Sequence, residues 1–233
     1  TISSEVAMPH SYTRLKDEKA LHPTERLQRV INPFSHDGFN FTPLDYLKMA
    51  FIGVTLFPIR LGLILLIFST VILYVTLISI GADASKPFSP LRRALLQPVR
   101  LAVRLVILCV GFWYIPVRRQ PSSSRAKMLV VSPHSTFLDA FVLTYLEMPA
   151  FVAMKAVASM PVVGNVATAL QTIYVDRYDP DSKHKTAQVM KRRALEPGWP
   201  PLLVFPEGTC TNGRALISFK LGAFSPGQPV QPM

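Results

Sequence analysis

Cysteine and charge are both scarce in this sequence. Only two of the 233 residues are cysteines, Cys109 and Cys210, which excludes a disulfide framework of the kind that holds small secreted proteins together. Charged residues make up 17% of the chain, whereas hydrophobic residues make up 49%. So apolar a composition is unusual for a soluble protein and indicates a membrane-embedded part. The cysteines and histidines also lack the spacing of metal ligands, so we expect no metal site.

Acidic residues are scarcer than basic ones. The chain has 14 Asp and Glu against 25 Lys and Arg, which gives a formal net charge of +11. A basic chain can bind nucleic acid, anionic lipid headgroups or phosphorylated ligands. Proteins that bind single-stranded nucleic acid combine positive charge with aromatic stacking platforms, whereas here the charge accompanies apolar runs. We therefore expect membrane lipids and phosphorylated ligands as partners, and no nucleic acid.

The first 119 residues divide into a polar part and an apolar part. Residues 1–43 are polar without sustained periodicity, which predicts a flexible arm, and they lack the apolar core of a cleavable signal peptide. Residues 44–119 predict membrane-embedded or interfacial helices. Within them Leu61–Ile80 has no charged residue, and as a helix it would be about 30 Å long, enough to cross a bilayer. A buried helix of a soluble protein is the alternative.

A second apolar stretch, Leu101–Pro116, contains Arg104. Only Leu105–Ile115 is free of charge, which is short for a membrane span. The stretch predicts an amphipathic or half-inserted helix, with arginines at the lipid headgroups and with Trp113 and Tyr114 at the interface.

Beyond residue 120 the pattern changes. Residues 121–124 are typical of a linker, and residues 120–233 predict an α/β domain with a mixed or mainly parallel sheet flanked by helices. Its expected strands are Met128–Val131, Phe151–Met154, Thr172–Val175, Leu202–Phe205 and Leu216–Phe219. Its expected helices are roughly Asp139–Tyr145, Val162–Leu170 and Ser182–Leu195, the last capped by Ser182.

A histidine and an aspartate follow the first of these strands. Pro133 should end the strand, with His134 next and Asp139 five residues later. On a regular helix five residues place two side chains about 140° apart, so the pair can meet only if His134 lies in the turn before the helix. The carboxylate would then hold one imidazole nitrogen and leave the other basic. A structural histidine capped by a nearby acid is the alternative.

Polar segments also follow the other strands. Lys155 comes after the second strand, Arg177 after the third, and Phe205–Thr209, with the letters FPEGT, after the fourth. With the H-x-x-x-x-D pair, they resemble the four sequence blocks of the glycerolipid acyltransferases, in order, over about residues 50–233, and the chain ends inside the fourth block. Phe219–Phe224 and Pro229–Pro232 fit the lysophosphatidylcholine acyltransferase branch of that family. The letters EGTCTN resemble the lysophosphatidylcholine acyltransferase branch. The region before Met128 is shorter than is usual in that family, so an early strand could be absent.

The resemblance implies a catalytic role for His134 as general base and for Asp139 as its orienting acid. It implies an acyl transfer from acyl-CoA to a lysophospholipid, with lysophosphatidylcholine as the first candidate, and no cofactor besides acyl-CoA as co-substrate. It also implies an integral membrane protein of the endoplasmic reticulum, with the catalytic domain facing the cytosol and continuing past Met233. The residues that it assigns to substrate binding are Lys155, Arg177, Glu207, Gly208, Thr209 and Lys220.

Two other functions fit the sequence. One is a membrane-anchored lipid-binding module without catalysis, which would use the same basic surface. The other is a thioesterase or hydrolase with Cys210 as its nucleophile. The residues alone leave both open.

Overall fold

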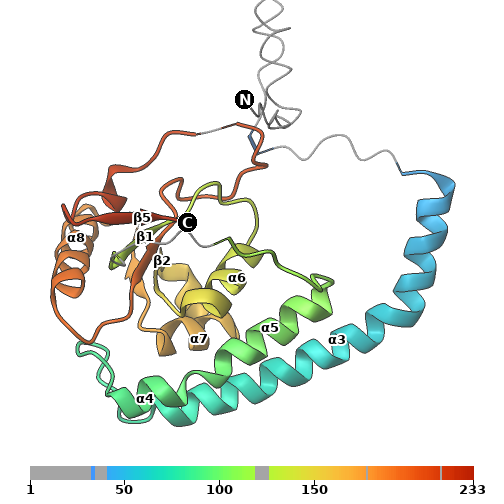
Figure 1. The fold of residues 1–233 in the computed structure, drawn as a ribbon, viewed down its shortest axis with the longest axis horizontal. Helices are drawn as coiled ribbons and strands as arrows, with labels where there is room; N and C mark the ends of the chain where they lie inside the picture. Colours follow the sequence, from blue (N-terminus) through green and yellow to red (C-terminus); the bar gives the residue numbers. More distant parts are fainter. Residues whose placement is uncertain (1–32, 35–40, 119–125, 177, 216) are drawn as a thin grey trace, which may run out of the picture.

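A computed structural model describes residues 33–34, 41–118, 126–176, 178–215 and 217–233. Most of the predicted arm and all of the predicted linker at 121–124 therefore lie outside the described residues. Three helices precede a sheet that is covered by further helices (Figure 1). The helices are α3 (Pro43–Ser79), α4 (Pro90–Leu95), α5 (Pro98–Val110), α6 (Leu138–Glu147), α7 (Val163–Ala169) and α8 (Pro180–Leu195). The strands are β1 (Met128–Val130), β2 (Ala150–Met154), β3 (Ile173–Val175), β4 (Leu202–Val204) and β5 (Val230–Pro232).

The sheet has the strand order β3-β2-β4-β1-β5. Every described pair is parallel, and the central pair aligns Met128 with Leu202 and Val130 with Val204. This confirms the predicted α/β fold and makes its sheet parallel. Because all strands run the same way, their carboxyl ends meet at one edge, where α/β proteins bind ligands.

Helices cover both faces of the sheet. Alternate side chains of a strand point to opposite faces, so Met128 and Leu202 pack with Met190 of α8. Leu129 and Leu203 point the other way and pack with Leu143 of α6. Burial on both faces explains why these strands are continuous apolar runs rather than alternating ones.

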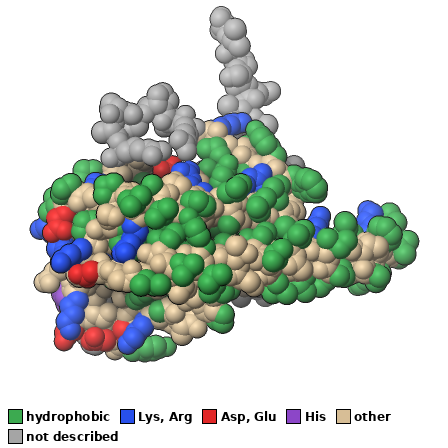
Figure 2. All heavy atoms as spheres, turned by 90° about the horizontal axis from the view of Figure 1, so that it is seen from below, with side chains coloured by type: hydrophobic (Ala, Val, Ile, Leu, Met, Phe, Trp, Pro, Cys, Tyr) green, Lys and Arg blue, Asp and Glu red, His purple; other side chains and the backbone are tan. Residues whose placement is uncertain are grey.

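Helix α3 contains nearly all of the predicted membrane span in one continuous element. It begins at a capping box in which the Thr42 hydroxyl accepts a hydrogen bond from the Asp45 backbone amide and the Asp45 carboxylate accepts one from the Thr42 amide. Pro58 lies inside the helix and lacks the N–H of one helical hydrogen bond; the helix is curved in Figure 1. Figure 2 shows hydrophobic side chains along the part of α3 that projects from the molecule.

The large exposed surface of α3 favours a membrane helix over the buried core helix of a soluble protein. Only 11% of its most apolar 18-residue window is buried, and in the described part of the chain it is the one helix long and apolar enough to cross a membrane. Leu65 and Leu66 are 57% and 64% exposed. In water such a surface would be costly, because about 25 cal/mol is lost for each Å² of apolar area left exposed.

Helix α5 is amphipathic, as its sequence predicts, but two of its arginines bind the protein itself. The Arg100 guanidinium donates to the carbonyl oxygens of Tyr145 and Leu146 at the end of α6. Arg104 donates to the carbonyl oxygens of Phe112 and Trp113. Arg100 therefore satisfies carbonyl oxygens at the end of α6, and Arg104 bonds the segment that follows α5.

One hydrophobic cluster joins the N-terminal helices to the α/β domain. Val71 and Val75 of α3 pack with Val103 and Ile107 of α5, and Phe141 of α6 and Val166 of α7 lie against the same cluster. The position of α3 is thus fixed relative to the sheet by side-chain packing.

Four of the five predicted strands are confirmed to within one or two residues, and the fifth is wrong. Ile217–Phe219 forms no strand, and Leu216 lies outside the described residues. The fifth strand is instead β5, which pairs with β1. The three predicted helices are present, but the cap of α8 is Asp179, whose side chain accepts from the Asp181 amide. The Ser182 hydroxyl accepts from the Asp176 amide instead.

We predict that the protein stays with the membrane pellet after washing at alkaline pH. Leu66→Arg places a charge in the middle of α3, which costs about 2.5–3.5 kcal/mol at a bilayer centre, and should increase the fraction released. The measurement is the amount of protein in pellet and supernatant.

The matched control is Leu195→Arg, because Leu195 is similarly exposed, at 61%, on α8 of the α/β domain. Complete release of the unaltered protein by the wash would contradict an integral membrane helix.

Candidate active site

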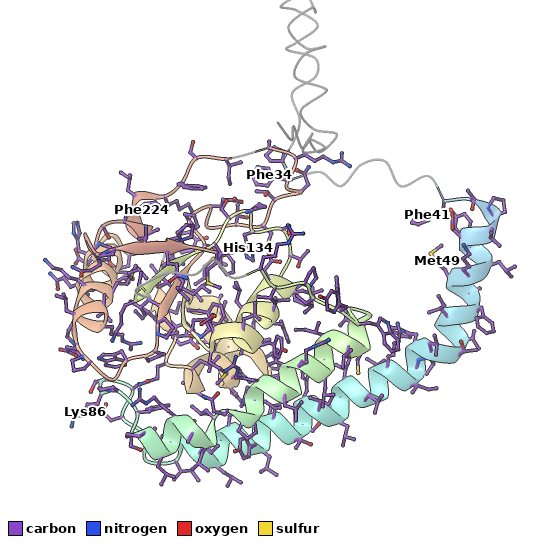
Figure 3. The ribbon with its side chains drawn as sticks, viewed as in Figure 1. Phe34, Phe41, Met49, Lys86, His134 and Phe224 are labelled. Carbon is purple, nitrogen blue, oxygen red and sulfur yellow. The ribbon has the colours of Figure 1, made fainter. Side chains whose placement is uncertain are left out.

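The parallel sheet brings four polar segments to one edge. The segment with His134 leaves the carboxyl end of β1, Lys155 leaves β2, Asp176 leaves β3 and Glu207 leaves β4. In Figure 3 His134 lies beside the strand ends, on the same side of the molecule as Phe34 and on the opposite side from Lys86. The backbone amide of Asn212, beyond β4, donates to the carbonyl oxygen of Pro33 at 2.7 Å.

His134 and Asp139 meet as the spacing predicts. His134 lies in the loop before α6, and its Nδ1 is 2.9 Å from Oδ2 of Asp139 in the first turn of that helix. The two side chains are 15% and 25% exposed. Because an ionised carboxylate only accepts hydrogen bonds, Nδ1 carries the proton in this arrangement and Nε2 is the basic nitrogen. Nε2 has no hydrogen-bond partner among the residues that the structure describes.

The carboxylate of Asp139 is held in place by several donors. The backbone amides of Ser135 and Thr136 donate to its Oδ2 at 2.8 and 3.1 Å. Burial raises the pKa of Asp139, but the hydrogen bonds from His134, Thr136 and Ser135 outweigh burial and lower that pKa below its ordinary value. Asp139 therefore stays ionised at neutral pH and can stabilise a protonated imidazole.

The loop after β4 contacts both the ring and the backbone of His134. The ring of Phe205 stacks on the imidazole, with centroids 3.8 Å apart and planes inclined by 15°. The Thr211 backbone amide donates to the His134 carbonyl oxygen at 2.8 Å. Phe205 and Thr211 both lie in the FPEGTCT segment, but neither was assigned a role from the sequence.

Glu207 is buried, at 2% exposure. Its Oε1 accepts from the Ser132 hydroxyl at 2.5 Å, and its Oε2 accepts from the Thr211 hydroxyl at 3.3 Å. Ser132 was likewise assigned no role from the sequence. The nearest sign of its position was its place two residues before His134, at the exit of a predicted strand.

Two of the residues expected to bind substrate, Lys155 and Lys220, carry a positive charge. Lys155 is exposed and lies 3.7 Å from the Asp176 carboxylate, which follows β3. Arg177, the next residue, lies outside the described residues. Gly208 has a positive φ of 67°, and a Cβ built there would lie only 2.8 Å from the Lys220 ammonium. Lys220 therefore crosses directly over Gly208, and a larger residue at this position would displace it.

Cys210 is exposed, but its thiol is not activated. Burial, together with the negative charges of Asp139 and Glu207, raises the pKa of Cys210. A raised pKa lowers the fraction of thiolate, the form that acts as a nucleophile. Among the described residues no group of three or more His, Cys, Asp or Glu could hold a metal ion.

A histidine held by an aspartate at the carboxyl edge of a parallel sheet can take up a proton, so the site defines an α/β protein suited to acid–base chemistry, with a helix long and apolar enough to cross a membrane. Residues 115–233 match the family model described as acyltransferase. The chain belongs to the acyltransferase family, as its four sequence blocks indicate.

Curated relatives place it near one branch of that family. The chain is 37% identical to lysophosphatidylcholine acyltransferase 1 of Danio rerio over 87% of its own length and 40% of the relative's. It is 34% identical to lysophosphatidylcholine acyltransferase 2B of Rattus norvegicus, over 99% of the chain and 44% of the relative. A lysophospholipid acyltransferase of Mus musculus is 36% identical over 91% of the chain and 42% of the relative. The chain thus spans less than half the length of these relatives. No solved structure matches it.

The lowered pKa of Asp139 predicts how stability depends on pH. Its ionised form is stabilised by folding, so this contribution is fully present above the unfolded pKa of about 3.9 and is lost as pH falls through the lower folded pKa. Asp139→Asn should lower the unfolding temperature at pH 6 and have a shrinking effect below about pH 4. The measurement is thermal unfolding in detergent from pH 3 to pH 6.

Asp181→Asn is the control, since Asp181 is an exposed carboxylate in the first turn of α8. A loss of stability in Asp139→Asn that is the same at every pH would contradict this account.

Proposed function

We propose that the protein is an acyl-CoA-dependent acyltransferase that acylates a lysophospholipid, with lysophosphatidylcholine as the first candidate. The single observation that carries the proposal is the 2.9 Å contact of His134 Nδ1 with Asp139, which leaves Nε2 as an oriented base. Membership of the acyltransferase family supports the reaction class. The printed names of the relatives support the lysophospholipid acceptor.

In the proposed reaction His134 Nε2 takes the proton of a free hydroxyl group on the lysophospholipid. The oxygen attacks the thioester carbonyl carbon of acyl-CoA, an ester bond forms, and the carbon–sulfur bond breaks. The departing sulfur takes the proton back from the imidazolium, so His134 returns to its starting state. General-base catalysis of this kind is worth roughly 10²–10⁴ in rate. The reaction needs no metal or cofactor besides acyl-CoA as co-substrate.

We propose that the acceptor's phosphate binds on the β2–β3 side of the edge. Lys155, which follows β2, and Arg177, which follows Asp176 in the sequence, would supply the positive charge, and Gly208, Thr209 and Lys220 would contact other parts of the acceptor. Strands β2 and β1 stand on either side of β4, so their ends are about 10 Å apart. This distance suits an acceptor whose phosphate and reacting hydroxyl are bound at separate points.

The proposed setting is a membrane, with the endoplasmic reticulum as the expected compartment and the catalytic domain in the cytosol, where acyl-CoA is found. The exposed apolar surface of α3 supports contact with membrane lipids. The packing of α3 and α5 against α6 would hold His134, whose loop leads into α6, at a fixed place near the bilayer that contains the acceptor.

Two alternative functions, a thioesterase and a lipid-binding module, can each be tested. The raised pKa of Cys210 disfavours a thioesterase that uses this cysteine as its nucleophile. A lipid-binding module without catalysis would bind lysophospholipid and release no CoA. Acyl-CoA consumption that requires an added lysophospholipid, measured over a panel of lysophospholipids, separates the proposed transferase from both, because a thioesterase consumes acyl-CoA without the acceptor.

We expect His134→Ala to lose nearly all transfer and Cys210→Ser to keep a substantial fraction. Asp139→Asn should also be severe, because an amide favours the wrong imidazole tautomer, as it does in serine-protease triads. The measurement is CoA release by the full-length protein, with thermal unfolding to check that each variant folds. An isolated thioester to Cys210, together with an inactive but folded Cys210→Ser, would show that direct transfer is wrong.

Arg177→Ala should mainly raise the KM for the lysophospholipid. Loss of a charged hydrogen bond to phosphate costs on the order of 1.5–3 kcal/mol, which corresponds to a roughly ten- to more than hundredfold change. The KM for acyl-CoA should change much less. Lys86→Ala is the control, because Lys86 is an exposed cation on the opposite side of the molecule from His134 (Figure 3). An unchanged acceptor KM in Arg177→Ala would remove Arg177 from the site.

A further inference from the structure

We propose that Glu207 is a positioning residue that holds the His134 loop in place, rather than a residue that contacts substrate. The inference rests on the proposed function, since it assigns Glu207 a part in the same reaction. It differs from the substrate contact that the family resemblance implied. Four residues take part in this arrangement: Ser132, His134, Glu207 and Thr211.

The first observation is that Glu207 has little surface to offer a substrate. The residue is 2% exposed, and each carboxylate oxygen already accepts a hydrogen bond from a hydroxyl group. Because so little of the residue is exposed, an acceptor could reach the carboxylate only by displacing the Ser132 or the Thr211 side chain. A buried hydroxyl left without a partner costs about 1–3 kcal/mol, so such a contact would be made against a penalty.

The second observation is that the two partners of Glu207 reach His134 by different routes. Ser132 lies two residues before His134 in the same loop, and its hydroxyl donates to Oε1 at 2.5 Å. Thr211 donates its hydroxyl to Oε2, and its backbone amide donates to the His134 carbonyl oxygen at 2.8 Å. Glu207 therefore fixes the loop at two points, one through Ser132 and one through Thr211. We call these three residues the Glu207 bracket.

The third observation is that the bracket has a rigid base. Glu207 follows three residues after Val204, which is paired with Val130 in the centre of the sheet. Leu203 of the same strand is fully buried, and Phe205 stacks on the imidazole. A group attached so close to a central strand can set the position of the loop that leaves the neighbouring strand.

The Glu207 bracket would affect the reaction through the position of His134 Nε2. Asp139 sets the tautomer of the imidazole, whereas the bracket sets the place of the backbone from which the ring projects. If the loop moves, Nε2 leaves hydrogen-bond reach of the acceptor hydroxyl, and a displacement of about 1 Å can cost 10²-fold in rate. Substrate affinity should be little changed, because Lys155, the proposed phosphate-binding cation that the structure describes, follows β2 on the other side of β4.

The test separates kcat from KM. We expect Glu207→Ala to lower kcat by on the order of 10²-fold while both KM values stay near those of the unaltered protein. Glu207→Gln keeps one carbonyl acceptor, and its amide can donate to a rotated hydroxyl, so it should recover most of kcat. A rise in the acceptor KM with kcat unchanged would overturn the inference in favour of a substrate contact.

Substitutions of Ser132 and Thr211, the two partners of Glu207, provide a second test in which smaller losses of kcat are expected. Thr211→Val and Ser132→Ala each remove one arm of the bracket and should lower kcat less than Glu207→Ala. Combined with Glu207→Ala, either change should add little, because the bond it removes is already lost. Fully additive effects on kcat would show that Glu207 acts independently of the bracket.

Hydrogen–deuterium exchange tests the bracket without relying on activity. The peptide that covers residues 131–137 should exchange faster in Glu207→Ala and return toward the original rate in Glu207→Gln, while the α8 peptide stays unchanged. If the unaltered protein transfers no acyl group, the proposed function fails, but faster exchange in residues 131–137 would still support the bracket. Unchanged exchange in a folded Glu207→Ala would overturn the inference whatever the activity.

Discussion

The parallel pairing of β1 with β4 is the constraint on which the site depends. The two strands are aligned along Met128–Val130 and Leu202–Val204 and are buried on both faces. Since they run the same way, the loops that leave them lie side by side, although Ser132 and Glu207 are 75 residues apart in the chain. If this pairing were lost, His134 would keep Asp139, its neighbour in sequence, but would lose Phe205, Thr211 and the Glu207 bracket.

The negative charges near His134 and Cys210 disfavour a cysteine as the nucleophile. Hydrogen bonds from the loop keep Asp139 ionised, and the same negative charge, with that of Glu207, raises the pKa of the nearby Cys210 thiol. The carboxylate that orients His134 therefore also opposes a thiolate at Cys210. This is what a site needs when the attacking oxygen belongs to the substrate and the protein supplies only the base.

Much of the fold could be predicted from the sequence because its signals are local. The first four strands are short apolar runs bounded by polar residues, and α3 contains an uncharged run of bilayer length. The errors occurred where the pairing partner is distant. Ile217–Phe219 has the composition of a strand but finds no partner, whereas β5 contains Pro232 and exposed residues and is a strand only because β1 lies beside it. An edge strand tolerates proline, so it carries little signal of its own.

For the site, the sequence by itself determined the contact between a histidine and an aspartate. Residues five apart can meet only across a helix start, and this local geometry fixes the pair of His134 and Asp139. The sequence also places the FPEGT segment after a strand. Only the tertiary structure decided what Glu207 does there, because the direction of a side chain depends on packing between strands that are distant in the chain. The pairing of β1 with β4 turns Glu207 away from the surface and toward Ser132 and Thr211, where its carboxylate is buried and accepts a hydrogen bond at each oxygen.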